Sequence, residues 1–288
     1  EADSPSVKPP RPPVPSYHRH HADAAGNGRR PRGVKEEEVS RQDRLSRIVD
    51  SVVARGSVRV DEVVADQGIS PATARRDLDD LAAQQLLIRT RGGASANPST
   101  GDVPLRYRTA RQPREKEAIA RAAAAMVHPG ETVGFNGGTT TTAAAHELGV
   151  RIAAEPEFTT RNIIIVTNAV NIANDLTIRE QARVVVTGGV ARTRSYELVG
   201  PLAELILPSI SIDTLFLGVN AVDLGGGFYT HNEDEAFINA ALVRASRRTV
   251  VLADSSKLDT GSFARICGLS DAHALITDRG ASPAALDV

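Results

Sequence analysis

The chain has 288 residues, of which 41% are hydrophobic and 24% are charged, and its formal net charge is −1. This composition is that of a soluble globular protein with one large or two modest domains, and the net charge gives no sign of nucleic-acid binding. The single cysteine, Cys267, excludes an internal disulfide, and no apolar run is long enough to span a membrane. We therefore expect a cytoplasmic protein without a membrane partner.

The N-terminal residues 1–38 are rich in Pro, Gly, Arg and His and have almost no apolar periodicity, which predicts a disordered tail. Three histidines in this segment, His18, His20 and His21, fit either a metal-binding tract or a solvated tail, and the composition favours the tail. No other metal site, no cofactor and no catalytic residue is predicted.

Three short helices, a strand and a glycine turn are predicted within residues 39–96. Apolar residues recur at helical spacing until Gly56 ends the first helix. The second helix is predicted to have Asp61 as its N-cap and to end at Gly68, and the third to have Ser70 as its N-cap. This order of elements is typical of a winged helix-turn-helix domain.

The third helix and the wing carry the side chains suited to DNA. The first turns of a recognition helix meet base edges in the major groove, where arginine can bond a guanine in two places or grip a phosphate. Asp77 is expected to orient an arginine, and Leu78 and Leu81 to face the core. The alternative is a small helical domain with exposed arginines, because many acids accompany the basic residues. The predicted DNA-binding residues are Ser70, Thr73, Arg75, Arg76, Arg89, Arg91 and Gly92.

Residues 97–113 are polar and rich in proline, and we interpret them as an interdomain linker. Residues 114–288 then alternate helices with strands that are rich in Val and Ile throughout. Strands of this kind are buried on both faces, so we predict an α/β domain with an open, mainly parallel sheet covered by helices. The stretch "YELVGPLAELIL" is interpreted as a helix interrupted at Gly200-Pro201.

The stretch "FNGGTTTT", residues 135–142, joins a predicted strand to a predicted helix. Backbone N–H groups and the positive end of the helix dipole make such a turn an anion site, and the threonine hydroxyls add donors. The stretch matches neither the Walker P-loop nor G-x-G-x-x-G. The alternative is an ordinary strand-to-helix turn capped by threonine.

Ligands of open α/β sheets bind beyond the carboxyl ends of the strands, where this sequence repeatedly places small or polar residues. A second glycine turn brings Arg192 and Arg194 to the same edge, either as partners of a charged ligand or as solvated loop residues. Glu233 is equally explained as an acid at a helix N-terminus, and His231 as an incidental loop residue. The predicted effector-binding residues are Asn136, Gly137, Gly138, Thr139, Thr140, Thr141, Asn168, Gly188, Gly189, Arg194, Asn220, Glu233, Asp254 and Lys257.

Both halves of the chain resemble the DeoR family of transcriptional regulators. "SPATARRDL" followed by "RTRGGA" is similar to the DeoR-type helix-turn-helix, and "GGTTT", "VVVTGG", "DTLFLGVN" and "ADSSKL" are similar to the sensor domain. The resemblance implies a sensor fold like that of ribose-5-phosphate isomerase and a phosphorylated sugar as effector. It places Gly138, Thr139 and Thr140 at the phosphate, and Asp254 and Lys257 in the pocket.

Two positions depart from the commonest pattern of the family. Many relatives carry an acid where Asn136 stands and an Asp-Gly pair where Asn220-Ala221 stands. The resemblance places both positions at the sugar end of a ligand. These departures leave the phosphate site intact and the identity of the sugar open.

Two functions are compatible with these features. The first is a regulator, expected to be a repressor of a carbohydrate-catabolism operon, which binds a double-stranded DNA operator as a homo-oligomer, either a dimer or a tetramer. The second is a sugar-phosphate isomerase or deaminase with an added N-terminal domain, in which Asp254 or Glu233 would be the base. We predict the regulator and no enzyme, mainly because of the family resemblance, and also because only the regulator gives a purpose to both the third helix and the pocket.

Overall fold

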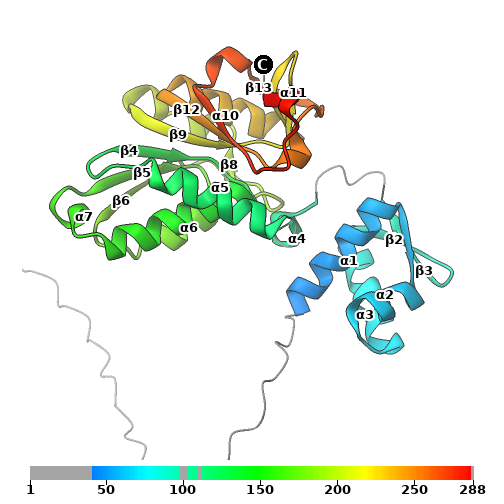
Figure 1. Cartoon of the computed structure of the whole chain (residues 1–288). Coiled ribbons are helices and arrows are strands. Elements are labelled where there is room, and N and C mark those ends of the chain that lie inside the picture. The colour runs from blue at the N-terminus through cyan, green and yellow to red at the C-terminus, as the bar shows by residue number, and fades with distance from the viewer. Residues whose placement is uncertain (1–40, 98–102, 109–111, 287–288) are drawn as a thin grey trace, which may run out of the picture. The chain divides into compact units, whose positions relative to one another are not determined.

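The computed structural model describes residues 41–97, 103–108 and 112–286 (Figure 1). The predicted tail, residues 1–38, and its three histidines lie outside the described residues. Among the described residues, no helix combines the length and the apolar character needed to cross a membrane.

The N-terminal elements are the predicted three helices and a β-wing. Strands β1, β3 and β2 pair in that order as an antiparallel sheet. The core lies between α1 and α3, where Leu78 and Leu81 are fully buried as expected. The elements are α1 (Arg41–Arg55), β1 (Ser57–Arg59), α2 (Val60–Gln67), α3 (Pro71–Ala83), β2 (Leu87–Thr90) and β3 (Gly93–Ala96).

The start of α2 differs from the prediction, whereas its end does not. Its N-cap is Arg59, and Asp61 lies inside the first turn, so the prediction of Asp61 as the N-cap is wrong. The helix begins earlier because β1 pairs with β3 as far as Arg59, and Val60 follows directly, its N–H donating to the Gly92 carbonyl at 2.9 Å. The helix ends at Gly68 in the left-handed conformation (φ 63°, ψ 33°), which glycine adopts without steric cost.

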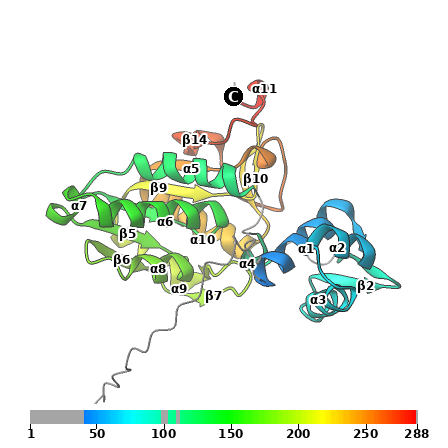
Figure 2. The ribbon, with the colours of Figure 1, turned by 60° about the horizontal axis from the view of Figure 1, so that its bottom comes forward.

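The α/β domain is built on a six-stranded parallel sheet of order β14-β12-β9-β4-β5-β6. Helices α5, α6 and α8 cover one face and α10 covers the other, each with its own apolar core (Figures 1 and 2). The elements of this framework are α5 (Pro113–Ala125), β4 (Thr132–Phe135), α6 (Thr139–Ala154), α7 (Glu157–Thr160), β5 (Ile163–Thr167), α8 (Val170–Leu176), β6 (Ala182–Val186), β9 (Ile212–Gly218), α10 (Glu233–Arg244), β12 (Ser246–Leu252) and β14 (Ala274–Ile276).

Further elements surround this framework, several of them absent from the prediction. Strands β10, β11 and β13 form an antiparallel sheet, and β7 pairs with β8. Part of the predicted linker is helical, as α4. These elements are α4 (Leu105–Arg108), β7 (Val190–Ala191), β8 (Leu198–Val199), α9 (Pro201–Glu204), β10 (Ala221–Asp223), β11 (Gly227–Thr230), β13 (Ala264–Cys267) and α11 (Pro283–Leu286).

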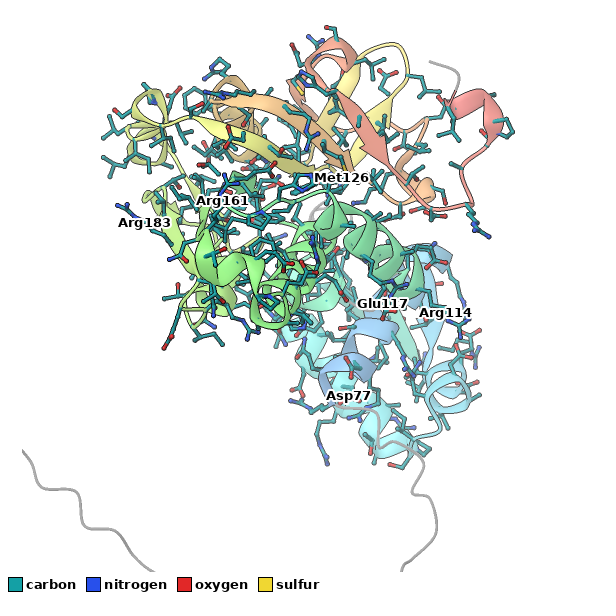
Figure 3. All side chains as sticks on the ribbon, turned by 60° about the vertical axis from the view of Figure 1, so that its left-hand side comes forward. Asp77, Arg114, Glu117, Met126, Arg161 and Arg183 are labelled. Atoms are coloured by element: carbon teal, nitrogen blue, oxygen red, sulfur yellow. The ribbon has the colours of Figure 1, made fainter. Side chains whose placement is uncertain are left out.

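Two expectations about single segments are wrong. The stretch "YELVGPLAELIL" is not one interrupted helix, because Leu198–Val199 is strand β8 and the α-helical turn α9 begins only at Pro201. The expectation that every strand is buried on both faces fails at β6 and β14. These are the two edge strands of the parallel sheet, and none of their residues is fully buried; Arg183 of β6 lies at the periphery of the domain (Figure 3).

Candidate functional site

The turn between β4 and α6 leaves one buried hydroxyl without a partner. Gly138 is the N-cap of α6 and has a φ of 144°, a conformation that residues other than glycine rarely adopt. Thr141 and Thr142 use their hydroxyls within the turn, donating to the Gly138 carbonyl at 3.1 and 2.6 Å. Thr140 is 1% exposed, and its hydroxyl has no hydrogen-bond partner. A buried unpartnered hydroxyl beside a helix N-terminus is the arrangement that an anionic ligand would complete.

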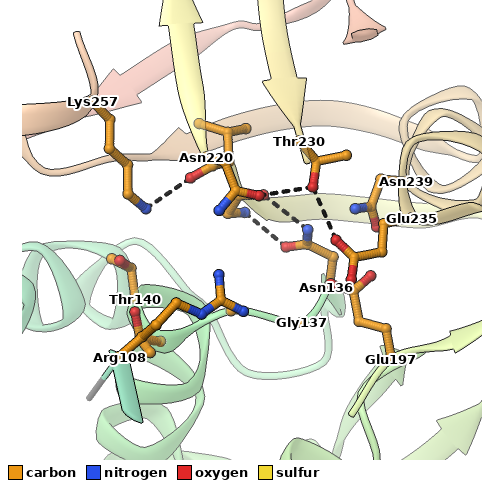
Figure 4. Close-up of a pocket in the computed structure, with 14 residues that line it drawn as sticks. Arg108, Asn136, Gly137, Thr140, Glu197, Asn220, Thr230, Glu235, Asn239 and Lys257 are labelled. Atoms are coloured by element: carbon orange, nitrogen blue, oxygen red, sulfur yellow. Dashed lines mark hydrogen bonds between the residues drawn. The ribbon is translucent and has the colours of Figure 1, made fainter. Parts of the chain in front are cut away.

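A pocket opens at this turn, beyond the carboxyl ends of β4 and β9 (Figure 4). Seven of the predicted effector-binding residues line it: Asn136, Gly137, Gly138, Thr139, Thr140, Asn220 and Lys257. Seven further residues that line it were not predicted: Arg108, Glu197, Gly218, Val219, Thr230, Glu235 and Asn239.

Another seven predicted residues do not line this pocket: Thr141, Asn168, Gly188, Gly189, Arg194, Glu233 and Asp254. Among them, Asn168 and Asp254 contact residues that do line it. Asn168 is fully buried and donates to Glu197 Oε2 at 3.0 Å, so it holds a residue that does line the pocket. Asp254 lies 4.0 Å from the Lys257 ammonium. Glu233 is exposed in the first turn of α10, whereas Glu235, two residues later, is buried and faces inward.

The two asparagines that depart from the family pattern are held by the protein itself. Asn136 donates its amide N–H to the Gly218 carbonyl at 2.9 Å and accepts from the Gly218 N–H at 2.7 Å, which ties the end of β4 to the end of β9. Asn220 accepts the Thr230 hydroxyl at 2.7 Å. Asn136 therefore holds the carboxyl ends of β4 and β9 together. Asn220 uses its amide oxygen for Thr230, which leaves its amide nitrogen for another contact.

Two acids meet in the pocket. Glu235 pairs with Arg192 at 2.8 Å and accepts the Thr230 hydroxyl at 2.9 Å. Burial raises the pKa of Glu197 to about 8, and the neighbouring Glu235 carboxylate adds to this effect. The opposite wall carries Lys257, whose ammonium donates to the Val219 carbonyl at 2.7 Å. Burial lowers the pKa of Lys257, and Asp254 opposes that shift.

A weak signal in the sequence could have located the two acids. Glu197 is a single acid in the otherwise uncharged stretch "YELVG", and Glu235 follows two helix-N-terminal acids at the spacing that turns it inward. Arg108 carried no such signal, because it stands among other arginines in a stretch interpreted as a linker.

The proposed DNA-binding side chains lie on α3 and the wing. Ser70 caps α3, accepting the Thr73 N–H at 3.1 Å. Arg75, Arg76 and Arg91 are exposed, and none has an ion-pair partner among the described residues. Two exposed arginines at the start of a helix remain available for base edges or phosphates.

Two further charged residues of this region are engaged within the protein. Arg89 pairs with Asp79 at 2.7 Å, which holds it against α3. Asp77 is 2% exposed and pairs with Arg44 of α1 at 2.8 Å, so it orients an arginine, as expected, but one outside the recognition helix. Within the described residues, no group of three or more His, Cys, Asp or Glu could hold a metal ion.

A winged helix joined to an α/β domain with a polar pocket at its strand ends is the architecture of a metabolite-responsive DNA-binding regulator. Residues 44–100 match the DeoR-like helix-turn-helix domain, and residues 111–279 match the DeoR C terminal sensor domain. The chain belongs to the DeoR family and is a transcriptional regulator.

Two curated relatives illustrate the similarity over most of the chain. The chain is 34% identical over 242 residues to the putative aga operon transcriptional repressor of Escherichia coli O157:H7, covering 83% of this chain and 86% of that relative. It is 31% identical over 240 residues to the glycerol-3-phosphate regulon repressor of Escherichia coli strain K12, covering 83% and 92%. Among solved structures, ribose 5-phosphate isomerase A from Methanocaldococcus jannaschii matches at 20% identity and a TM-score of 0.34, covering 49% of this chain and 52% of that one. That likeness is too distant to carry an argument about activity.

Proposed function

We propose that the chain represses a carbohydrate-catabolism operon and that a phosphorylated sugar in the pocket at the N-terminus of α6 controls its affinity for DNA. The buried, unpartnered hydroxyl of Thr140 is the observation that carries the effector part. Arg108 and Lys257 line the same pocket and supply positive charge for a phosphate (Figure 4). Relatives named as repressors of a glycerol-3-phosphate regulon and of a lactose phosphotransferase system support the sugar-phosphate class.

DNA recognition is assigned to Arg75 and Arg76 in the first turns of α3, with Arg91 on the wing. Two copies of the chain would present two such helices to a repeated or palindromic operator, because symmetric proteins bind symmetric sites. The homo-oligomer and a cytoplasmic location are part of this proposal. Molar mass in solution, measured by light scattering with and without operator DNA, tests the homo-oligomer, which a monomeric mass in both conditions would contradict.

Helix α4 offers a route between effector and DNA. Its Arg108 lines the pocket, and the Arg108 carbonyl accepts the Lys116 ammonium at 3.1 Å. One residue earlier, Tyr107 is 2% exposed and donates to Gln84 Oε1, after α3, at 2.7 Å. A ligand that binds Arg108 better in one position of α4 than in another would therefore shift the contacts made by Tyr107.

The enzyme alternative keeps one supporting observation, the carboxyl groups of Glu197 and Glu235 inside the pocket. An acid whose pKa is raised to about 8 has the character of a general acid or base at neutral pH. The bases considered from sequence have weaker support, because neither Asp254 nor Glu233 lines this pocket. Conversion of a sugar phosphate by the purified protein, followed by NMR, would revive this alternative.

The proposal is tested by titrating the full chain on DNA from its own promoter region and following fluorescence anisotropy with a panel of sugar phosphates. We expect one of them to release the DNA. Arg75→Ala and Arg76→Ala should each weaken DNA binding by roughly 5- to 100-fold, the range for losing a bidentate base contact. Arg47→Ala, which removes an exposed arginine from α1, is the control for the loss of charge. Wild-type affinity in both α3 variants would overturn the DNA assignment.

Thr140→Val tests the effector part. The variant replaces a hydroxyl with a methyl of similar size, so it should bind DNA as the parent does and lose the response to the effector. Thr159→Val, at an exposed position on α7, is the matched control and should keep that response. A full response in Thr140→Val would remove the α6 turn from the phosphate site.

A further inference from the structure

The pocket has two ends of opposite character (Figure 4). Arg108, Lys257 and the Thr140 hydroxyl lie at one end, where a phosphate would bind. Glu197, Glu235 and Asn239 lie at the other end. A ligand that fits both ends must present an anion to the first and hydrogen-bond donors to the second.

The acidic end contains one carboxyl group more than the protein neutralises at close range. Glu235 has its own arginine, Arg192, at 2.8 Å. Glu197 is 3% exposed and accepts one neutral hydrogen bond, from Asn168 at 3.0 Å, and within the described part of the chain no lysine or arginine forms an ion pair with it. A buried carboxyl without a cation is costly, and a second carboxylate beside it makes ionisation harder still.

The unused groups at this end are acceptors. The Oδ1 atom of Asn239 is buried and has no hydrogen-bond partner, and it lines the pocket together with the Glu197 carboxyl. A sugar hydroxyl donates one hydrogen bond and brings no charge. A primary ammonium donates three and also stabilises the ionised form of the Glu197 carboxyl group. A metal ion fits less well, because the described residues offer no group of three His, Cys, Asp or Glu side chains that could hold one.

We propose that the effector is a sugar phosphate that carries a primary amine, and that Glu197 selects its ammonium group. The inference rests on the proposed function, since it takes the α6 turn, Arg108 and Lys257 as the phosphate end. Glu235 remains paired with Arg192, and its negative charge adds to the attraction for the ammonium group. Asn239 accepts one of the ammonium hydrogens.

Calorimetric titration of the full chain with two matched pairs of ligands tests this selection. The pairs are glucosamine 6-phosphate with glucose 6-phosphate, and galactosamine 6-phosphate with galactose 6-phosphate, which differ only in an amine or a hydroxyl at one carbon. We expect the amine member of at least one pair to bind at least tenfold more tightly than its hydroxyl partner. N-acetylglucosamine 6-phosphate, in which the nitrogen is neutral, should lose that advantage.

Glu197→Gln tests whether the Glu197 side chain causes the preference for the amine ligand. Its amide oxygen can still accept from Asn168, so we expect the fold to be kept and the ratio of amine to hydroxyl affinity to fall to about one. Glu180→Gln, at an exposed position, is the control and should keep the preference. Glu197→Asp, which keeps the charge on a shorter side chain, should keep part of it.

The outcomes separate this inference from the function on which it rests. If sugar phosphates bind and release DNA but the hydroxyl members bind as tightly as the amines, the amine preference is wrong and the proposed function stands. An amine preference that survives in Glu197→Gln overturns the role of Glu197. If no sugar phosphate binds and Thr140→Val behaves as the parent, both fail.

Discussion

Two aspartates on α3, Asp77 and Asp79, form ion pairs of nearly equal length in very different surroundings. Asp77 is 2% exposed and lies 2.8 Å from Arg44, whereas Asp79 is 64% exposed and lies 2.7 Å from Arg89. Burial decides what such a pair contributes, because water screens the exposed one and not the other. Figure 3 shows Asp77 among the helices of the winged domain.

Asp77→Asn should therefore destabilise the winged helix by about 3 kcal/mol, because it leaves a largely buried guanidinium without its charge partner. Asp79→Asn, the matched control on the same helix, should cost less than about 1 kcal/mol. Native-state hydrogen exchange of the α1 and α3 amides measures these two changes in stability for the winged domain alone. Equal effects of the two substitutions would contradict the assignment of Asp77 to the core.

Glu197 makes the stability of the α/β domain depend on pH, and the direction of this dependence follows from its pKa shift. Burial and then Glu235 raise its pKa to about 8 from an ordinary 4.5, against the opposing effects of Asn168, Arg108 and Arg192. Between about pH 4.5 and pH 8, Glu197 therefore keeps its proton in the folded state and has lost it in the unfolded state. The contribution of Glu197 to stability is full below about pH 4.5 and is lost as the pH rises to about 8.

Glu197→Gln should reduce the dependence of stability on pH between about pH 4.5 and pH 8. Thermal unfolding of the ligand-free parent and the variant between pH 5 and 9 should show a Tm that falls more steeply with pH in the parent. Parallel profiles would mean that Glu197 does not hold this proton. A larger fall in the variant would reverse the assigned sign.

At the scale of elements, α3 and α6 each begin at a turn that the sequence marks clearly, and each has proposed binding residues near its N-terminus. Ser70 accepts the Thr73 N–H at 3.1 Å, and Pro71 follows at the first helical position. At α6 the N-cap is Gly138, which offers no side-chain cap. A side chain thus satisfies one of the free N–H groups of α3, whereas no cap side chain does so at α6, where we propose the phosphate.

Ser70→Ala should destabilise α3 by about 1 kcal/mol, because it removes the hydroxyl that caps the helix. The first turn, which directly precedes Arg75, would fray, so DNA affinity should fall as well. Ser70→Thr keeps a capping oxygen and should preserve both properties. Anisotropy on promoter DNA and hydrogen exchange of α3 provide the two measurements, and an unchanged exchange rate in Ser70→Ala would contradict the cap.

At the scale of the whole molecule, the proposed regulation couples effector and DNA through one equilibrium. If the effector weakens DNA binding by a given factor, operator DNA must weaken effector binding by the same factor. Calorimetric titration of the effector with and without operator DNA, compared with the anisotropy data, should give equal factors, and Thr140→Val should remove both. Unequal factors would contradict a single effector site coupled to DNA.

The fold class and much of the site could be predicted because both depend on local patterns. Apolar periodicity revealed the helices, and runs of Val and Ile revealed the buried strands. The edge position of β6 and the hairpin β7–β8 were missed, because edge position and pairing depend on partners far along the chain. The division of the chain into a tail, two domains and a linker stays a prediction, and α4 shows that part of the linker is structured.

The sequence by itself determined the recognition helix, its cap and the glycine–threonine turn, since each is encoded by neighbouring residues. Only the tertiary structure decided what faces that turn. Arg108, Glu197 and Glu235 come from separate segments and meet because the sheet order and the packing of α10 bring them together. It also decided that Asn136 bonds to Gly218. The electrostatic character of a pocket is a property of distances through space, and no stretch of sequence contains those distances.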